Sequence, residues 1–204
     1  MRIDLKKARP DLYRPSTKEF TLVDVPPMRY LAYDGHGDPN TSAEYAAALT
    51  ALYASGYSIR ATFKARTGDD FVVGPLEGLW SADDPRVFAE GAKDEWDWTM
   101  MIPLPEQVED ADIVAGFESA TVRKPDVPVD EVYVFDLHEG PSLQIMHIGS
   151  YDDEAPTLAR LHNEVMPAHG GTFNGRHHEV YLSDPRRTAP EKLKTILRHP
   201  VKPL

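Results

Sequence analysis

The sequence predicts an α+β fold in which a strand–helix–strand–strand unit occurs twice around a pseudo-twofold axis. Both halves of the chain present candidate elements in the same order: two strands, a helix and two further strands. Residues 33–39, before the first helix, resemble residues 147–152, before the second, and residues 75–83 resemble residues 177–184. Such a duplication places a cleft between the halves, where small-molecule sites tend to form.

The first half follows a polar leader, residues 1–18, which we expect to lie on the surface or to pair loosely. Two strands come next, one from Glu19 and one over residues 28–33, separated by two prolines. Residues 46–54 are rich in alanine and leucine and predict a helix that stops at Gly56. Residues 57–66 either extend this helix or form an irregular connection.

The first half ends with two strands, over residues 71–80 and 96–104, on either side of an acidic loop from Ser81 to Glu95. A short helical pattern, residues 108–117, lies between prolines. Residues 126–130 then read as the linker between the halves.

The second half predicts strands over residues 132–137 and 143–148, then a helix that starts at Glu154 and stops at Gly170-Gly171. A strand around Glu179 follows. The tail, residues 189–198, holds either a short helical turn with a final strand or one helix. We therefore expect one domain over residues 19–204, made of repeats 19–125 and 126–204.

Composition restricts the class of function. The chain has 204 residues, a formal charge of −11 and no cysteine. The acidic balance argues against a nucleic-acid or anionic-membrane binder, and the missing thiols exclude disulfides and cysteine nucleophiles. No apolar run is long enough for a membrane span, and the N-terminus lacks the apolar core of a signal peptide. The expected compartment is the cytoplasm.

Residues 177–183 carry the main candidate site. On a strand, His177, Glu179 and Tyr181 share one face, while Val180 and Leu182 share the other and suit a core. A carboxylate beside a phenol on a rigid strand suits binding or proton transfer. The alternative is an ordinary half-exposed strand.

Further candidates come from the repeat and from tryptophan spacing. Aligning the repeats matches Glu77 to Glu179, so both glutamates are expected to face the cleft. Trp98 and Met100 alternate along residues 96–104 and form either a cleft wall or part of the core. A bulge at Gly78 is needed to bring Trp80 to the side of Glu77. No metal site is expected, because the adjacent histidines 177 and 178 point to opposite faces.

Three motifs (residues 75–80, 96–102 and 177–185) and the ending 191–201 resemble the GyrI-like small-molecule-binding family, from about Glu19 onward. The resemblance implies the fold of the bacterial effector-binding domains. It also implies a stand-alone protein, similar to members that hydrolyse cyclopropanoid, spirocyclopropyl-dienone genotoxins. The family's central acidic residue maps onto Glu179. The implied ligand is a small hydrophobic or aromatic molecule, without nucleic acid, membrane, metal or cofactor.

The chemistry implied by the resemblance is the opening of a cyclopropane ring by water while the ring carbonyl becomes a phenolate. Glu179 would be the general base and Tyr181 the hydrogen-bond donor to the oxyanion. Trp80 and Trp98 would sandwich the ligand, with Glu77, His147 and His177 as additional proton carriers. Two alternatives stay open: a non-catalytic binder of hydrophobic or cationic drugs, and a protein that inhibits DNA gyrase.

Overall fold

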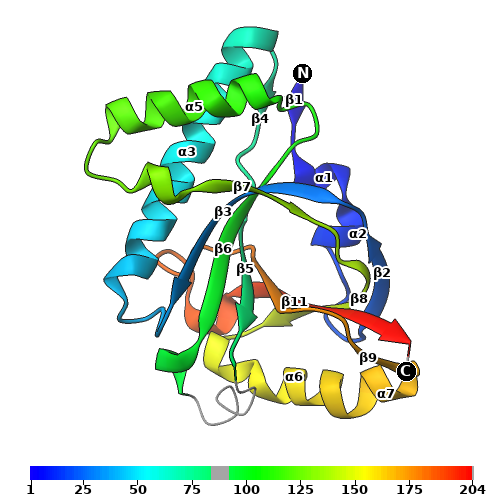
Figure 1. Cartoon of the computed structure of the whole chain (residues 1–204). Coiled ribbons are helices and arrows are strands. Elements are labelled where there is room, and N and C mark those ends of the chain that lie inside the picture. The colour runs from blue at the N-terminus through cyan, green and yellow to red at the C-terminus, as the bar shows by residue number, and fades with distance from the viewer. Residues whose placement is uncertain (84–91, 204) are drawn as a thin grey trace.

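The computed structural model describes residues 1–83 and 92–203 and confirms an α+β fold. In the described part, a nine-stranded sheet has the order β2-β8-β11-β10-β5-β6-β3-β7, with β9 paired to β11. Figure 1 shows this sheet strongly curved, with α3 and α5 packed on each other at one end and α6 and α7 at the other. The predicted loop from Ser81 to Glu95 lies partly outside the described residues.

The duplication is visible in the topology. The elements of the first half are β2 (Thr21–Val25), β3 (Met28–His36), α3 (Ala43–Thr67), β4 (Asp70–Phe71), β5 (Leu76–Ser81), β6 (Asp97–Leu104) and α5 (Asp110–Arg123). Those of the second half are β7 (Tyr133–Leu137), β8 (Gly140–Ile148), α6 (Ala155–Arg160), α7 (Met166–Ala168), β9 (Gly171–Phe173), β10 (His177–Tyr181) and β11 (Lys194–Pro203). The halves meet where β5 pairs with β10, and each lends its first strand to the other: β2 pairs with β8, and β7 with β3.

The first long helix, α3, runs past the predicted stop at Gly56 and ends at Gly68. Its start is fixed by Ser42, whose hydroxyl accepts a hydrogen bond from the backbone N–H of Tyr45 at 3.2 Å. Gly68 takes the left-handed conformation, with φ of 76°, that favours glycine at a helix end. Gly56 is buried against Val73 instead, so the glycine serves close packing.

The second helix is less regular. After α6, residues Leu161–Val165 form a π-helical segment, η4, before α7, and Gly170 ends the run with φ of 62°. The tail follows the first of the two predicted alternatives: a 3₁₀ turn, η5 (Pro190–Lys192), leads into the long strand β11.

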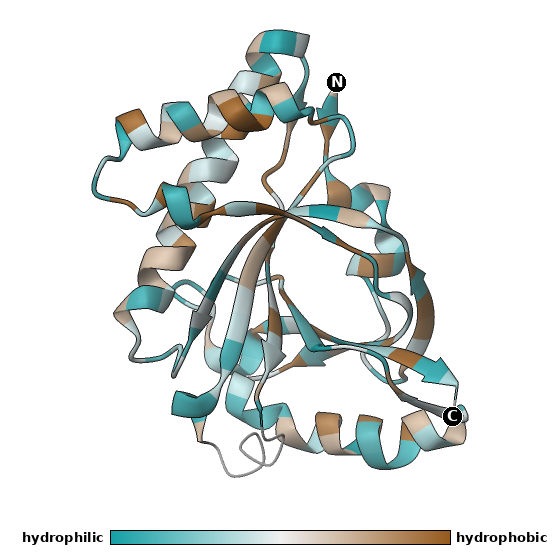
Figure 2. Ribbon diagram, viewed as in Figure 1, coloured by the Kyte–Doolittle hydropathy of each residue, from teal (hydrophilic) through white to brown (hydrophobic). Residues whose placement is uncertain are grey.

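The two faces of the sheet bury different residues, and Figure 2 shows apolar residues gathered along the strands where they converge. On one face, α3 packs on β3 and β6, and α5 packs on α3, around a core that includes Leu52, Ile59 and Ile102. On the same face, Leu161 and Met166 of the second helical run pack on Leu143. On this face, α3 of the first repeat lies on one side of the middle strands β5 and β10, and the second helical run lies on the other side.

The N-terminal leader packs more tightly than the sequence predicts. It forms β1 (Arg2–Ile3), α1 (Leu5–Ala8) and α2 (Pro10–Tyr13). Strand β1 pairs with β4, and α1 and α2 lie beside β2 in Figure 1. Leu12 and Tyr13 are 0% and 3% exposed and pack on Val180 and Ile196, on the face of the sheet opposite α3. Residues 1–18 are thus an integral layer of the fold.

Candidate functional site

The Glu179 carboxylate lies on β10, near the axis that relates the two repeats. Its side chain is 14% exposed. The hydroxyl of Tyr181 donates a hydrogen bond to Oε2 at 2.8 Å, and Nε2 of His177 lies 3.2 Å from Oε1. The strand alternation predicted for these three residues therefore brings them together. Each carboxylate oxygen keeps a lone pair for a further donor, such as water.

Tyr181 makes two hydrogen bonds that its predicted role as donor to an oxyanion does not include. It accepts a hydrogen bond from Nε1 of Trp80 at 2.9 Å while it donates its single proton to Glu179. Burial and the charge of Glu179 raise its pKa well above the usual value, so the phenol keeps this proton. In this arrangement Tyr181 holds the carboxylate of Glu179, which accepts the one proton that the predicted role assigns to an oxyanion.

Tyrosines from other elements surround this cluster. The ring of Tyr151, in the 3₁₀ turn η3 (Tyr151–Asp153), packs edge-on against Tyr181, with 5.8 Å between centroids. Burial and then the charge of Glu179 raise the pKa of the Tyr45 hydroxyl on α3, so this ring lies near the carboxylate. Burial, followed by the charges of Glu154 and Glu179, raises the pKa of Tyr151 to about 12. Glu179 thus lies among aromatic rings contributed by both repeats.

A second carboxyl group near Glu179 was not predicted. Glu154, directly before α6, is only 4% exposed. Burial and the charge of Glu179 raise its pKa to about 9, although the hydroxyl of Thr195 offsets part of the rise. The sequence presents this residue only as the start of a helix, and no local signal indicates that tertiary packing buries it.

The predicted aromatic walls are mostly part of the core. Trp80 and Met100 share the face of Glu179, as their register shows, and are 7% and 0% exposed. Trp98 is 1% exposed, lies stacked near Tyr33 and donates from Nε1 to the carbonyl of Gly37 at 3.2 Å. Trp98 pairs across the strands with Trp80, so it shares the face of Glu179, where the rings of Tyr33 and Tyr45 pack against it.

Glu77 requires a correction, because it lies on the opposite face from Glu179. In the register of β5 and β10, Glu77 pairs with Val180, while Glu179 pairs with Gly78. A pseudo-twofold axis normal to the sheet keeps every residue on its own face, so the predicted match of Glu77 to Glu179 is off by one residue. No bulge brings Trp80 to the side of Glu77, since the pairing of β5 and β10 is regular there.

Glu77 belongs to a buried charge network. His178 lies between two carboxylates: Nε2 is 2.9 Å from Oε2 of Glu77, and Nδ1 is 3.0 Å from both oxygens of Glu139. Tyr13 donates to Glu77 at 2.9 Å, and Arg198 lies 3.4 Å from Glu139. Burial lowers the pKa of His178, but the two carboxylates more than reverse this and raise it to about 9. Two cations therefore balance two anions, a structural arrangement.

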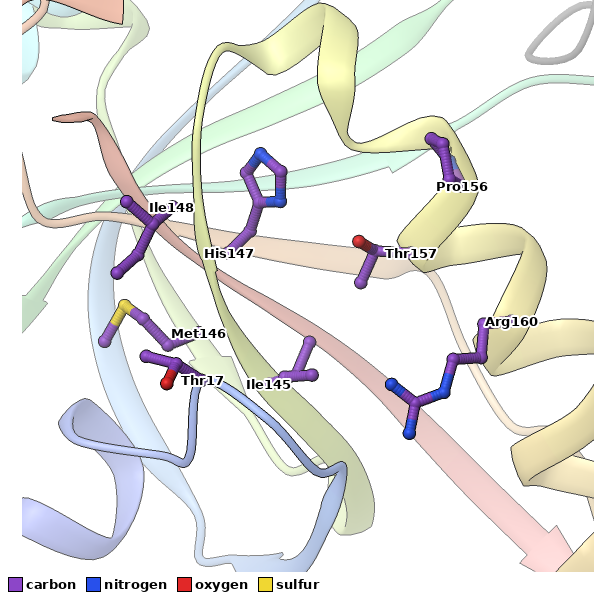
Figure 3. A pocket seen from close by; sticks show the side chains of 8 residues that line it. All are labelled: Thr17, Ile145, Met146, His147, Ile148, Pro156, Thr157 and Arg160. Carbon is purple, nitrogen blue, oxygen red and sulfur yellow. The ribbon is translucent and has the colours of Figure 1, made fainter. Parts of the chain in front are cut away.

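His147 lines a cavity at the C-terminal end of β8. Figure 3 shows it with Thr157 and Arg160 of α6 on the opposite side and Ile145, Met146 and Ile148 along the strand. The cavity measures about 440 Å³. His147 and Glu179 lie on strands β8 and β10, which are separated by β11, so this cavity does not contain the Glu179 cluster.

Other histidines gather beside His177. The ring of His199 lies 5.8 Å from that of His177 and 5.6 Å from that of His162. Burial and the neighbouring imidazoles lower the pKa of His199 to about 3. In residues 1–83 and 92–203, no group of three or more acidic or histidine side chains is arranged to hold a metal ion. No helix in those ranges is long and apolar enough to cross a membrane.

Comparisons with known proteins agree with this architecture. A family model, the GyrI-like small molecule binding domain, matches residues 18–202. A crystal structure of an uncharacterized conserved protein from Listeria innocua is 37% identical, with a TM-score of 0.90, over 98% of this chain and 100% of that one. Two structures described as hydrolases from the same organism are 36% and 35% identical, with TM-scores of 0.84 and 0.88. They cover 98% and 99% of this chain, and the whole of each matched chain. None of the curated proteins compared with the chain matches it.

Proposed function

The chain belongs to the GyrI-like small-molecule-binding domain family, and on that premise we propose that it is a hydrolase of planar, electrophilic small molecules. The proposed reaction is the addition of water to a spirocyclopropyl-dienone, without a cofactor. The hydrolase description of the Listeria innocua relatives supports a hydrolytic reaction. The observation that carries the proposal is the Glu179 carboxylate, oriented by His177 and Tyr181 among tyrosines from both repeats.

Glu179 is the proposed general base. Water donates a hydrogen bond to a free lone pair of the carboxylate, and its oxygen attacks a cyclopropane carbon of the bound ligand. The bond between that carbon and the spiro carbon breaks, and its electron pair restores an aromatic ring. The former carbonyl oxygen takes the resulting negative charge, while Glu179 receives the proton of water.

His177 and Tyr181 contribute by holding the base in place. They contact different oxygens of Glu179, so the carboxylate cannot rotate freely about its last bond. A base fixed in one orientation lowers the entropic cost of reaching the transition state. The aromatic rings of Tyr45 and Tyr151 suit a flat ligand, because offset and edge contacts between rings are favourable.

Replacing Glu179 by Gln tests this proposal, because the amide keeps the size of the side chain and removes the base. We expect kcat to fall by about 10² to 10⁴-fold. Binding of a neutral planar ligand, followed by quenching of tryptophan fluorescence, should change by less than about threefold, because the neutral contacts remain. Equal turnover by the wild type and the variant would retire Glu179 as the base.

A second function is favoured by the same carboxylate. An anion among tyrosine rings is also suited to a lipophilic organic cation, through ion pairing and cation–π contacts. In that case Glu179→Gln weakens binding of the cation, and the wild type shows no turnover of the dienone. The two measurements on one variant therefore separate a hydrolase from a cation binder.

A further inference from the structure

Two buried polar atoms near the Glu179 cluster make no hydrogen bond of regular geometry, although the two groups lie close enough for the Thr195 hydroxyl to lower the pKa of Glu154. They are Oε1 of Glu154 and Oγ1 of Thr195, which belong to residues only 4% and 1% exposed. Buried polar atoms are nearly always satisfied by protein or by water, so an unsatisfied pair marks a place where a ligand atom can bind. The two residues come from different elements, the turn before α6 and strand β11.

The register of the sheet places this pair beside the proposed base. Thr195 is the direct cross-strand partner of Tyr181 on one side and of His147 on the other, so it shares the face of Glu179. Glu154 follows the turn whose Tyr151 ring packs against Tyr181. The two atoms therefore lie at the Tyr181 end of β10, and His177 lies at the other end.

We propose that Glu154 and Thr195 form the polar end of the ligand site and bind the ring carbonyl oxygen of a planar substrate. This inference rests on the proposed hydrolase function and extends it. It gives the substrate class a required feature, a carbonyl conjugated to the reacting ring. It also supplies the oxyanion partner that Tyr181 cannot provide, because the proton of Tyr181 is donated to Glu179.

The protonation of Glu154 fits this role. Its pKa of about 9 means that the side chain is a neutral carboxylic acid at pH 7, and such an acid can donate a hydrogen bond to a carbonyl oxygen. The titratable and polar groups around it are Glu179 and Tyr181 on β10, Thr195 on β11, His147 on β8, and Tyr151 and Asp152 in η3. Of these, Glu179 has the larger effect among the charged groups.

The two carboxyl groups then divide the reaction between them. Glu179 accepts a proton from the attacking water, and Glu154 gives its proton to the ring oxygen as the cyclopropane bond breaks. The net change is the addition of one water molecule, which yields a phenol with a hydroxyalkyl or ring-expanded alcohol group. Glu154 leaves the step ionised and Glu179 leaves it protonated, so exchange of one proton restores the resting state.

Two variants test the proposal through turnover. Glu154→Ala should lower kcat/KM for the dienone by about 100-fold, the effect of removing one oxyanion donor. Glu154→Gln keeps a neutral donor and should stay within about tenfold of the wild type. The wild-type rate should fall as pH rises through about 9, and the Gln variant should lack this fall. Glu164→Gln, an exposed carboxylate of the same helical run, is the matched control and should leave the rate unchanged.

A binding measurement separates this inference from the hydrolase proposal. Fluorenone and fluorene differ by one carbonyl oxygen, and we expect the ketone to bind about tenfold more tightly, a preference that Glu154→Ala abolishes. Infrared spectra at pH 7 should contain a protonated carboxylic acid band that Glu154→Gln removes. Thr195→Val should reduce the ketone preference as well, and melting curves establish that each variant is folded. Turnover without a ketone preference or an acid band would overturn the inference, whereas a ketone preference without turnover would retire the hydrolase alone.

Discussion

The hydroxyl of Tyr181 donates a hydrogen bond to the carboxylate of Glu179, two residues earlier on the same strand, at 2.8 Å. Side chains two residues apart on a strand point the same way, so this contact follows directly from the period of β10. The same hydroxyl accepts from Trp80 of the other repeat. The proposed base is therefore held by a chain of contacts that crosses the boundary between the two repeats.

Tyr181→Phe removes this chain without changing the shape of the ring. We expect kcat to fall by about tenfold, because Glu179 loses one of its two orienting contacts. The free energy of unfolding should fall by about 1–2 kcal/mol, since Nε1 of Trp80 loses its acceptor. Tyr57→Phe, at a tyrosine that is 55% exposed, is the control and should change neither quantity. An unchanged kcat in the Tyr181 variant would show that Glu179 needs no orientation.

Gly78 provides the space beside Glu179. A methyl group at this position would meet Nε1 of Trp80 at 3.0 Å, Sδ of Met100 at 3.1 Å and the hydroxyl of Tyr181 at 3.2 Å. Gly78→Ala should therefore displace Tyr181, weaken ligand binding and destabilise the fold by about 1–3 kcal/mol. Gly171→Ala, where the nearest atom lies at 3.5 Å, serves as the comparison in urea unfolding. Equal destabilisation of the two alanine variants would contradict a close approach of side chains at Gly78.

Stability should decrease above neutral pH. His178 and Glu154 each have a pKa of about 9 in the folded protein, against usual values of 6.5 and 4.5. In the unfolded chain both groups have released their protons by about pH 7.5, whereas the folded protein still holds them. The stability that these bound protons contribute is complete below the unfolded-state pKa values and is lost as pH rises through about 9. We expect the free energy of unfolding to fall by about 1.4 kcal/mol per pH unit for each group.

Urea unfolding between pH 7.5 and 8.5 measures this slope. The wild type should show the linkage of two protons and Glu154→Gln the linkage of one. His138→Asn, at an exposed histidine, should match the wild type. A flat profile in the wild type would mean that neither group holds its proton in the folded state.

The N-terminal helix α2 should contribute to stability. Leu12 is fully buried against the face of the sheet that holds Glu77 and His178, and its carbonyl accepts a hydrogen bond from Arg198 at 2.9 Å. Leu12→Ala should cost about 2–5 kcal/mol, the usual range for a buried leucine. Leu22→Ala, at a leucine that is 60% exposed, should cost less than about 0.5 kcal/mol in the same thermal or urea measurement. Similar losses in both would contradict the packed leader.

Local periodicity explains what the sequence could predict. Alternation over a few residues predicts the order of strands and the alternation of side chains between the two faces of β10. It also groups His177 with Glu179 and Tyr181. The same reasoning failed for Glu77, because an alignment between repeats that slips by one residue moves a side chain to the other face. The register is set by pairing between strands that are distant in the sequence, so it cannot be predicted from the residues of one strand.

Burial set by tertiary contacts explains the rest. Glu154 lies in a turn that resembles an ordinary helix start. Its pKa is altered by burial and by Glu179 and Thr195, which come from strands about 25 and 40 residues later. The polar leader likewise offers only scattered apolar anchors, Ile3, Leu5, Leu12 and Tyr13, without a continuous pattern that would indicate a packed layer. Continuation of α3 through Gly56 reflects packing against Val73, which outweighs the low helix propensity of glycine.

The most direct test of the account is a single turnover of a spirocyclopropyl-dienone in ¹⁸O-labelled water, with enzyme in excess and the product analysed by mass spectrometry. If Glu179 acts as a general base, the wild type forms a hydrated product that carries the label in its first turnover, and Glu179→Gln forms almost none. An unlabelled product would show that Glu179 itself attacks the ligand as a nucleophile. Equal hydration by the variant, or no hydration by the wild type, would contradict the proposed hydrolase and its base.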